Sequence, residues 1–448
     1  MKRIIIKYVI AMLAILPLVS CSLTGSYSDD DNNSKSESIG DKKSEATDIS
    51  KNKQDPNEIT IWGYQQGWEN YKADFEKAHP GIKLKFVPVD LDLSGNITSK
   101  LLDQMAEGAA PDIINIQFNW LMGQYNYIDG LADLYQPPFN AKSIIDKIPK
   151  NQSCWTTTTD GKKLLAIPLV PRARVTYFRE DIMKKYGFPS DPVELGEYIQ
   201  KPDNWLKIAR ELKKHNIWIM QWAVDPLDIY INNTGFYDNK MNFIRNTNRI
   251  AEMLYTIRMI NAEELASYVG IWEPKGQKTI KDGRMAMVYM GDYGESNLEA
   301  WAPETSGKWR ATRLPFGAYN PDGWNALAIS KSSKHKELAW ELVKKIYEDD
   351  RKLYTDILNE KSNFLGGQKA QKLYADLRSK IPEYYFTPFE KKMKDLWDTE
   401  VLNYSGYTYR EKDDFKAVKD IENKFSDVFG NDLSILSKYL GVKNRFKG

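Results

Sequence analysis

Cysteine and histidine are scarce in this chain of 448 residues, and their scarcity limits the chemistry that the chain can perform. The two cysteines and three histidines are widely separated: Cys21, Cys154, His79, His215 and His335. A disulfide framework, a zinc site or a Ser–His–Asp triad needs more of these side chains, or a recognisable spacing between them. No G-x-S-x-G nucleophile motif is present. We therefore expect no catalytic residue, no metal and no cofactor, and we expect Cys154 to pack in an apolar core.

An excess of charge of one sign is also missing. The formal net charge is +2, and removing the three cations of the first segment, Lys2, Arg3 and Lys7, leaves −1. A nearly neutral chain has no long-range attraction for a phosphate backbone, so we expect no nucleic-acid partner.

The chain opens with a hydrophobic run that is too short to cross a membrane. A basic Met1-Lys2-Arg3 precedes the mostly apolar Ile4–Val19, a pattern that predicts a secretory signal peptide at residues 1–20. The ending Leu18-Val19-Ser20-Cys21 resembles the bacterial lipobox, in which the cysteine receives lipid and becomes the new N-terminus. The alternative is an ordinary signal peptide that ends in a chance cysteine.

Apolar side chains are rare in residues 22–56, where Tyr27 is the single aromatic residue. Such a segment cannot bury enough surface to offset its chain entropy, so it should be disordered. We predict a lipidated Cys21 and a tether, residues 21–56, with a random-coil reach of roughly 30 Å. They would hold the folded part of the chain at the extracellular face of the cell membrane.

After residue 56, short β-branched runs alternate with segments of helical spacing. Strands are predicted at 58–62, 82–89 and 111–116, and helices at 68–78 and 97–105. This alternation predicts an α/β fold with a parallel sheet.

Ligands of such sheets bind beyond the carboxyl ends of the strands. Polar and aromatic residues stand at two of these ends: Tyr64, Gln65, Gln66, Gln117, Asn119 and Trp120. They are the first candidates for a binding site.

Several short motifs follow one another in a recognisable order. They are GAAPDI at 108–113, DGKKLLAIP at 160–168, YFREDI at 177–182, KDGRMAM at 281–287, LPF at 314–316 and AISKSSK at 328–334. Each is weak alone, but in this order they resemble the family 1 extracellular solute-binding proteins. These are receptors of sugar-importing ABC transporters, similar in pattern to maltodextrin-binding proteins.

The resemblance implies a two-lobed, periplasmic-binding-protein-like α/β fold with a ligand cleft between the lobes. The N-terminal lobe would contain residues 57–170 and 318–346, and the C-terminal lobe residues 171–317 and 347–448. Hinge segments would cross near 170–172, 316–320 and Tyr347. The implied partners are a saccharide and the permease subunits of an importer, with the protein a monomer and not an enzyme.

A sugar site needs aromatic faces for the ring and polar groups for the hydroxyls. The N-terminal lobe offers Trp62, Tyr64, Gln66, Asn119 and Trp120, and the C-terminal lobe offers Trp222, Asp225, Trp272, Asp292 and Tyr293. Two further candidates lie at the crossings, Arg172 at the first and Trp324 just after the second. The resemblance implies that Tyr293 presents an aromatic face, at a position where the family often has tryptophan. The alternative for the tryptophans is a role in the core, and Trp218–Trp222 also has the pattern of a buried strand.

Arg172 and Arg174 leave two interpretations open. If either faces the cleft, it could pair with a carboxylate and favour an acidic saccharide. Otherwise they are ordinary surface arginines near the hinge. At the level of the whole protein, the rival functions are a secreted polysaccharide-active enzyme and a receptor for another solute, such as a peptide.

Overall fold

The computed structural model describes residues 55–63, 69–88, 103, 107, 110–117, 130–231, 234–405 and 413–443. Several predictions lie outside these residues: the signal peptide, Cys21, nearly all of the tether and most of the helix predicted at 97–105. The same is true of five predicted site residues: Tyr64, Gln65, Gln66, Asn119 and Trp120.

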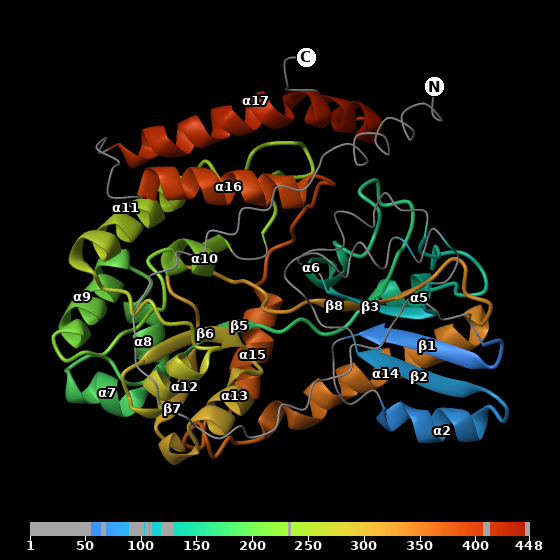
Figure 1. Ribbon diagram of the computed structural model, residues 1–448, viewed down its shortest axis with the longest axis horizontal. Helices are drawn as coiled ribbons and strands as arrows, with labels where there is room; N and C mark the ends of the chain where they lie inside the picture. Colours follow the sequence, from blue (N-terminus) through green and yellow to red (C-terminus); the bar gives the residue numbers. More distant parts are fainter. Residues whose placement is uncertain are drawn as a thin grey trace, which may run out of the picture. The chain divides into compact units, whose positions relative to one another are not determined.

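The first sheet has five strands in the order β2-β1-β3-β8-β4. Figure 1 labels the first four of them. Their bounds are β1 Glu58–Gly63, β2 Lys83–Pro88, β3 Ile113–Gln117, β4 Ile167–Pro168 and β8 Asn325–Ile329. β1 pairs in parallel with β2 and β3, which confirms the three predicted strands and their direction. β8 is antiparallel to β3 and β4, because it enters from a distant part of the chain and not through a helical crossover. The sheet is therefore mixed, where we expected a parallel one.

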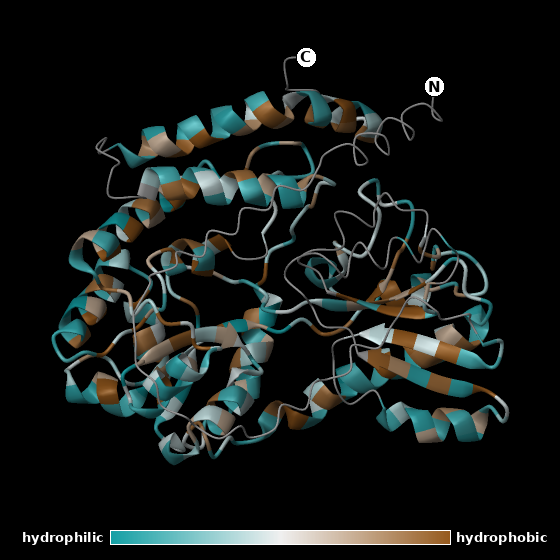
Figure 2. Cartoon of the chain, viewed as in Figure 1, coloured by the Kyte–Doolittle hydropathy of each residue, from teal (hydrophilic) through white to brown (hydrophobic). Residues whose placement is uncertain are grey.

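Two helices pack on this sheet. Helix α2 (Asn70–Ala78), which the sequence predicted, contacts β2, and α14 (Lys336–Asp356) contacts β8 and β4. Apolar side chains of the sheet and of the helices form one core. The strands contribute Ile59, Ile61, Ile113, Leu327 and Ile329. Helix α14 contributes a stripe with helical spacing: Ala339, Leu342, Val343 and Ile346. Figure 2 shows the hydropathy of these elements: β1 and β2 are largely hydrophobic (brown) and α2 is largely hydrophilic (teal).

The second sheet has three antiparallel strands in the order β6-β5-β7. Their bounds are β5 Arg174–Arg179, β6 Met287–Gly291 and β7 Trp309–Thr312. Neighbouring residues of β5 enter different cores, Tyr177 on one face and Phe178 on the other. Since successive side chains of a strand point to opposite faces, this sheet is buried on both sides.

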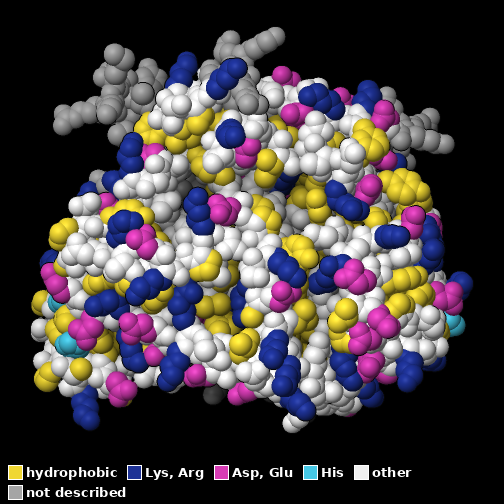
Figure 3. Space-filling view, turned by 180° about the vertical axis from the view of Figure 1, so that it is seen from behind, with side chains coloured by type: hydrophobic (Ala, Val, Ile, Leu, Met, Phe, Trp, Pro, Cys, Tyr) yellow, Lys and Arg dark blue, Asp and Glu magenta, His cyan; other side chains and the backbone are white. Residues whose placement is uncertain are grey.

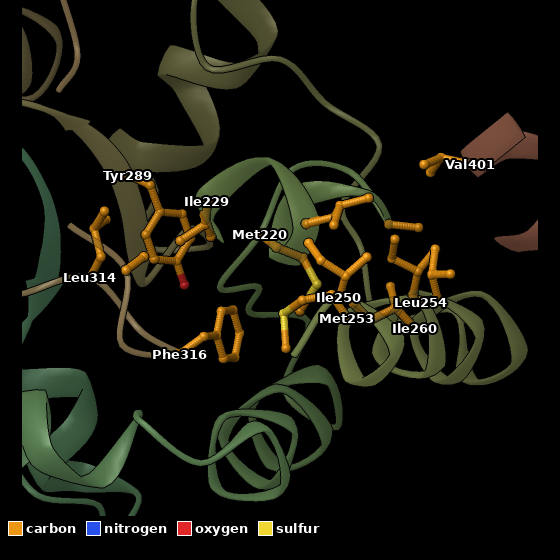
Figure 4. Close-up of a cluster of buried hydrophobic side chains, with 14 of the residues drawn as sticks. Met220, Ile229, Ile250, Met253, Leu254, Ile260, Tyr289, Leu314, Phe316 and Val401 are labelled. Atoms are coloured by element: carbon orange, nitrogen blue, oxygen red, sulfur yellow. The ribbon is translucent and has the colours of Figure 1, made fainter. Parts of the chain in front are cut away.

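Helices supply both of these cores. Their bounds are α7 Glu180–Lys185, α8 Pro192–Tyr198, α9 Pro202–Lys213, α10 Asp225–Ile231, α11 Asn248–Glu263, α12 Pro274–Lys281, α13 Gly294–Trp301, α15 Ala370–Ser379, α16 Glu390–Ser405 and α17 Asp414–Leu440. Short helices complete the chain: α5 Lys142–Ile145, α6 Lys150–Ser153, η2 Pro303–Thr305 and η3 Ile357–Asn359. Figure 4 shows the larger core, where Ile250 and Met253 of α11 lie near Met220. Helices α15–α17 make up most of the described residues after Gln368.

The segment Trp218–Trp222 differs from its prediction as a strand. Ile219 and Met220 are buried as expected, but Trp218 forms only an isolated bridge, with Met285. The pairing stops because the carboxylate of Asp225 accepts hydrogen bonds from the next two backbone N–H groups, those of Gln221 and Trp222. The chain turns there and begins α10.

Three connections join the elements of the two sheets. Residues 169–173 run from β4 to β5, residues 313–324 run from β7 to β8, and α14 with η3 leads toward α15. The first two pair with each other, since the Arg172 N–H donates to the Gly323 carbonyl at 3.1 Å and the Asp322 N–H to the Arg172 carbonyl at 2.7 Å. α14 continues unbroken past Tyr347 to Asp356. The exact limits of the lobes stay a prediction.

Candidate functional site

The loop after β6 carries two predicted site residues, Asp292 and Tyr293. β6 ends at Gly291 and α13 begins at Gly294, so the loop is very short. A Cβ at Gly291 would lie 2.5 Å from the Tyr293 ring and 2.9 Å from the Asp322 carbonyl oxygen. Only glycine therefore lets the tyrosine ring pack against the end of the strand.

Asp292 is buried between two arginines. Its Oδ2 accepts from Nη1 of Arg378 at 2.8 Å, and its Oδ1 lies 3.5 Å from Nη1 of Arg172. Burial raises the pKa of the Asp292 carboxyl, against the opposing effect of the two guanidinium groups. Both carboxylate oxygens are thus engaged within the protein.

The hydroxyl of Tyr293 is engaged as well. It donates to Oδ2 of Asp322 at 3.2 Å. Burial, with the nearby Asp322 carboxylate, raises the pKa of Tyr293, and burial also raises the pKa of Asp322. The tyrosine is therefore a neutral donor at any physiological pH.

Arg172 of the first connection and Arg174 at the start of β5 each face an aspartate. Nη2 of Arg174 lies 3.0 Å from Oδ2 of Asp228, and Nη1 donates to the Asp228 carbonyl at 3.3 Å. Arg172 pairs with Asp292 and also lies over the ring of Tyr354, 5.2 Å from its centroid. Neither guanidinium carries an uncompensated charge that would attract an acidic ligand.

Exposed aromatic side chains gather near the start of α10. Trp222 is 42% exposed and Trp272 is 57% exposed, although tryptophan is usually well buried. Trp222 meets Tyr268 edge-on with ring centroids 6.3 Å apart, and Trp272 meets Trp301 edge-on at 5.2 Å. A Cβ at Gly270 would lie 3.8 Å from the Trp222 indole. The segment that carries Tyr268 and Trp272 thus passes beside Trp222, and we name these three residues the aromatic group.

Asp225 holds the backbone that carries Trp222 of the aromatic group. Its Oδ2 accepts from the backbone N–H of Gln221 at 2.7 Å and of Trp222 at 3.2 Å. Burial raises the pKa of Asp225 to about 7. The carboxyl fixes the backbone from which the exposed Trp222 indole projects.

Trp62 and Trp324 belong to the first sheet and its margin. Trp62 is 4% exposed in β1, where it pairs with Val87 and Ile114. Trp324 is 1% exposed and stacks on Trp155 with ring centroids 5.5 Å apart. Both therefore pack within the protein, and their contact with a ligand stays a prediction.

The predicted site residues with described positions thus fall into three groups. Arg172, Asp292 and Tyr293 come together, Trp222, Asp225 and Trp272 form a second group, and Trp62 and Trp324 lie in or beside the first sheet. Sequence reasoning missed four residues that contact the first two groups or Arg174: Asp228, Tyr268, Asp322 and Arg378. No local signal marks them, because Arg378 is 86 positions from the aspartate that it contacts.

The single cysteine within the described residues shows no sign of reactivity. Cys154 is partly buried, and burial raises the pKa of its thiol to about 11. A thiol that stays protonated near neutral pH is a poor nucleophile. Among the described residues, no group of three or more His, Cys, Asp or Glu side chains could hold a metal ion.

Two surface features bear on other kinds of site. A cavity of about 240 Å³ is lined by β1, β2 and α2 with mixed charges, and it contains none of the predicted site residues. On the face in Figure 3, Lys and Arg side chains are interspersed with Asp and Glu. Within the described part of the chain, every helix is too short or too polar to cross a membrane.

Comparison with known proteins places the fold. Residues 62–352 match the family model described as bacterial extracellular solute-binding protein. An uncharacterized ABC transporter extracellular-binding protein of Pyrococcus horikoshii is 22% identical over 58% of this chain. That match spans 60% of the relative's own length.

Solved structures give the same picture. A galacto-N-biose/lacto-N-biose I-binding protein of an ABC transporter from Bifidobacterium longum, in complex with lacto-N-biose, has a TM-score of 0.65 at 18% identity. The similarity covers 87% of this chain and 100% of that one. An ABC transporter associated binding protein from B. animalis subsp. lactis, in complex with β-1,6-galactobiose, has a TM-score of 0.62 at 20% identity, over 83% and 97% of the two chains. The two-lobed fold expected from the sequence motifs is confirmed.

Proposed function

Because the chain belongs to the family of bacterial extracellular solute-binding proteins, we propose that it captures a saccharide outside the cell and delivers it to an ABC importer. Membership in the family accounts for capture of an extracellular solute. The saccharide, the permease subunits as partners and the lipid anchor are the proposed parts.

The exposed aromatic group carries the saccharide proposal. The chain buries Trp205, Trp309 and Trp324 almost completely, yet it leaves Trp222 and Trp272 in solvent. An indole face suits the C–H surface of a sugar ring, and its polar edge can still hydrogen-bond. Exposed aromatic residues beside a few fixed polar groups are the composition of a small-molecule site. The structures of similar fold were determined with lacto-N-biose and β-1,6-galactobiose, which supports the same class of ligand.

The charges near the site favour an uncharged saccharide. Arg172 and Arg174 are the cations that a uronate would need, but Asp292 and Asp228 already pair with them. A ligand carboxylate would have to displace or face these aspartates, which disfavours it. We therefore infer a neutral sugar and leave its length and linkage open.

The anchor rests on the sequence around Cys21. A lipidated cysteine followed by a polar tether would keep a monomeric receptor at the extracellular face of the cell membrane, within reach of the permease. We expect Cys21→Ser to release the protein from the membrane fraction into the medium. Continued association of that variant with membranes would argue against lipidation.

The ligand class is tested by thermal unfolding of the purified chain that starts at residue 22. Neutral disaccharides, uronate disaccharides and short peptides would each be titrated. A saccharide at 100 times its Kd should add about 2.7 kcal/mol to the free energy of unfolding. A shift with peptides alone would refute the saccharide, and chromatographic detection of glycan turnover would refute the receptor.

A further inference from the structure

Two adjacent residues of one loop hold two different connections between the sheets. Asp292 pairs with Arg172 of the connection 169–173, and Tyr293 donates to Asp322 of the connection 313–324. The two connections are themselves joined by the hydrogen bonds of Arg172 with Gly323 and Asp322. The loop after β6 is therefore fixed to the hinge segments at two points.

The third connection reaches the same place. Oδ2 of Asp350, on α14, accepts from the Val170 N–H at 2.7 Å. One turn later, the ring of Tyr354 lies 5.2 Å from the Arg172 guanidinium and 4.6 Å from that of Arg378. Arg378, from α15, closes the group through its 2.8 Å contact with Asp292. All three connections thus meet at one buried cluster.

We propose that Asp292 and Tyr293 are positioning residues, which set the angle between the lobes without touching the ligand. With Arg172, Asp322 and Arg378 they form what we name the hinge clasp. Hinge closure around a ligand changes the torsions of a few connecting residues, and groups that fix those torsions set the balance between open and closed forms. Solute capture depends on that balance, because a ligand binds with reduced affinity when the competent form is rare.

The energetics of the buried ion pair favour a role in fixing the hinge geometry over a role in stability. A buried ion pair adds little net stability over apolar packing, whereas removing one partner leaves an uncompensated charge. The Asp292 side chain is 2% exposed and that of Arg378 is 7% exposed. Asp292→Asn would leave Arg172 and Arg378 beside a neutral amide, so the contacts that fix the hinge should loosen.

Tyr293→Phe distinguishes a role of Tyr293 in the hinge clasp from a role in stacking on a sugar ring. It keeps the aromatic face but removes the hydroxyl that donates to Asp322. If Tyr293 acted only by stacking on a ring, the phenylalanine variant would behave as the parent does. Asp282→Asn is the matched control, since Asp282 pairs with Lys278 at 2.8 Å on the exposed surface of α12.

The test measures the distance between the lobes in the unliganded protein. Cysteines replacing the exposed Lys77 on α2 and Lys184 on α7 would carry spin labels, in a Cys154→Ser background and in the chain that starts at residue 22. We expect Asp292→Asn and Tyr293→Phe to broaden or shift the distance distribution, while Asp282→Asn leaves it unchanged. Distributions identical to the control in both clasp variants, even with lowered melting temperatures, would overturn the proposal.

A second measurement links the clasp to capture. For a saccharide that binds the parent, we expect the Kd of both clasp variants to rise by about tenfold, and Tyr293→Phe serves alone if Asp292→Asn fails to fold. Unchanged Kd values in a correctly folded Tyr293→Phe would remove Tyr293 from the clasp. The distance measurement needs no ligand, so its result stands even if the saccharide proposal fails.

Discussion

The hinge clasp and the aromatic group reverse the usual distribution of side chains in opposite ways. The clasp buries charge, with Asp292 and Arg378 almost fully withdrawn from solvent. The aromatic group exposes indoles, with Trp272 more than half accessible. Buried charges are expensive and exposed indoles forgo burial, so neither arrangement is explained by stability alone.

The difference separates two contributions to capture. Groups that are buried and mutually bonded can fix geometry, but they have no free surface to offer a ligand. Groups that are exposed and apolar can cover a ligand, but their removal should barely affect the fold. Substitutions in the clasp should therefore change stability and hinge geometry, and through the geometry the Kd. Substitutions in the aromatic group should change the Kd without changing stability or hinge geometry.

Arg378→Ala should have the largest effect. It removes the closest partner of Asp292 and leaves that carboxylate buried with Arg172 at 3.5 Å. Breaking a buried pair from one side typically costs about 3–5 kcal/mol. Urea unfolding would measure the loss, with Lys380→Ala, an exposed partner of Asp376, as the control. A loss in Arg378→Ala no greater than in the control would mean that the clasp is not a buried ion network.

Asp225→Asn tests how the buried carboxyl next to the exposed Trp222 indole affects stability at different pH values. Burial raises the pKa of folded Asp225 to about 7, against about 3.9 in the unfolded chain. Between these values the folded state keeps a proton that the unfolded state has released. This contribution to the free energy of unfolding is therefore complete below about pH 4 and is lost as the pH rises to about 7.

An asparagine does not titrate, so the free energy of unfolding of Asp225→Asn should not fall in this way. The difference between the variant and the parent should therefore shift in favour of the variant by roughly 2–4 kcal/mol between pH 4 and pH 8. Unfolding in urea at several pH values would measure the change. The exposed Asp282→Asn should show no such trend, and a flat difference for Asp225→Asn would show that Asp225 ionises normally.

Much of the first sheet could be predicted, because its strands carry their own local signal. Glu58–Gly63 and Ile113–Gln117 are β-branched runs that pair in the expected direction. The antiparallel β8 could not be placed by the same rule, since its neighbours in the sheet are far away in the chain. The strand pattern of Trp218–Trp222 was overridden by a single side chain, Asp225, which captures the backbone N–H groups.

The site was predicted less completely, for a related reason. Asp292 and Tyr293 could be named because they follow a recognisable motif. Their partners Arg378 and Asp322 stand in segments without a motif, and only the fold brings them to the loop after β6. A residue type in a sequence does not reveal whether its charge is already paired, and this pairing separates the clasp from a binding surface.

Trp272→Ala should affect binding and leave folding nearly unchanged. Burying an aromatic face against a ligand contributes roughly 1.5 kcal/mol, which corresponds to about a tenfold rise in Kd. Calorimetric titration with the preferred saccharide would measure the Kd, and thermal unfolding would check the fold. Tyr255→Ala on α11, also an exposed aromatic residue, is the control. Equal Kd values for the two variants would remove Trp272 from the binding surface.

Asp228→Asn should produce the smallest effect, a change in the preference for neutral over acidic ligands. Asp228 is half exposed and neutralises Arg174 at 3.0 Å, so its loss should expose part of a positive charge near the loop that carries Tyr293. Pairs of this kind are worth about 0.2–1 kcal/mol, so the preference for a neutral disaccharide over the matching uronate should narrow by about threefold. Competition titrations with the two sugars would measure it, with Asp181→Asn, the partner of Arg179 on the same strand, as the control. If the parent already prefers the uronate, the paired arginines do not select against acidic ligands. The clasp would then affect hinge geometry but not the preference between neutral and acidic ligands.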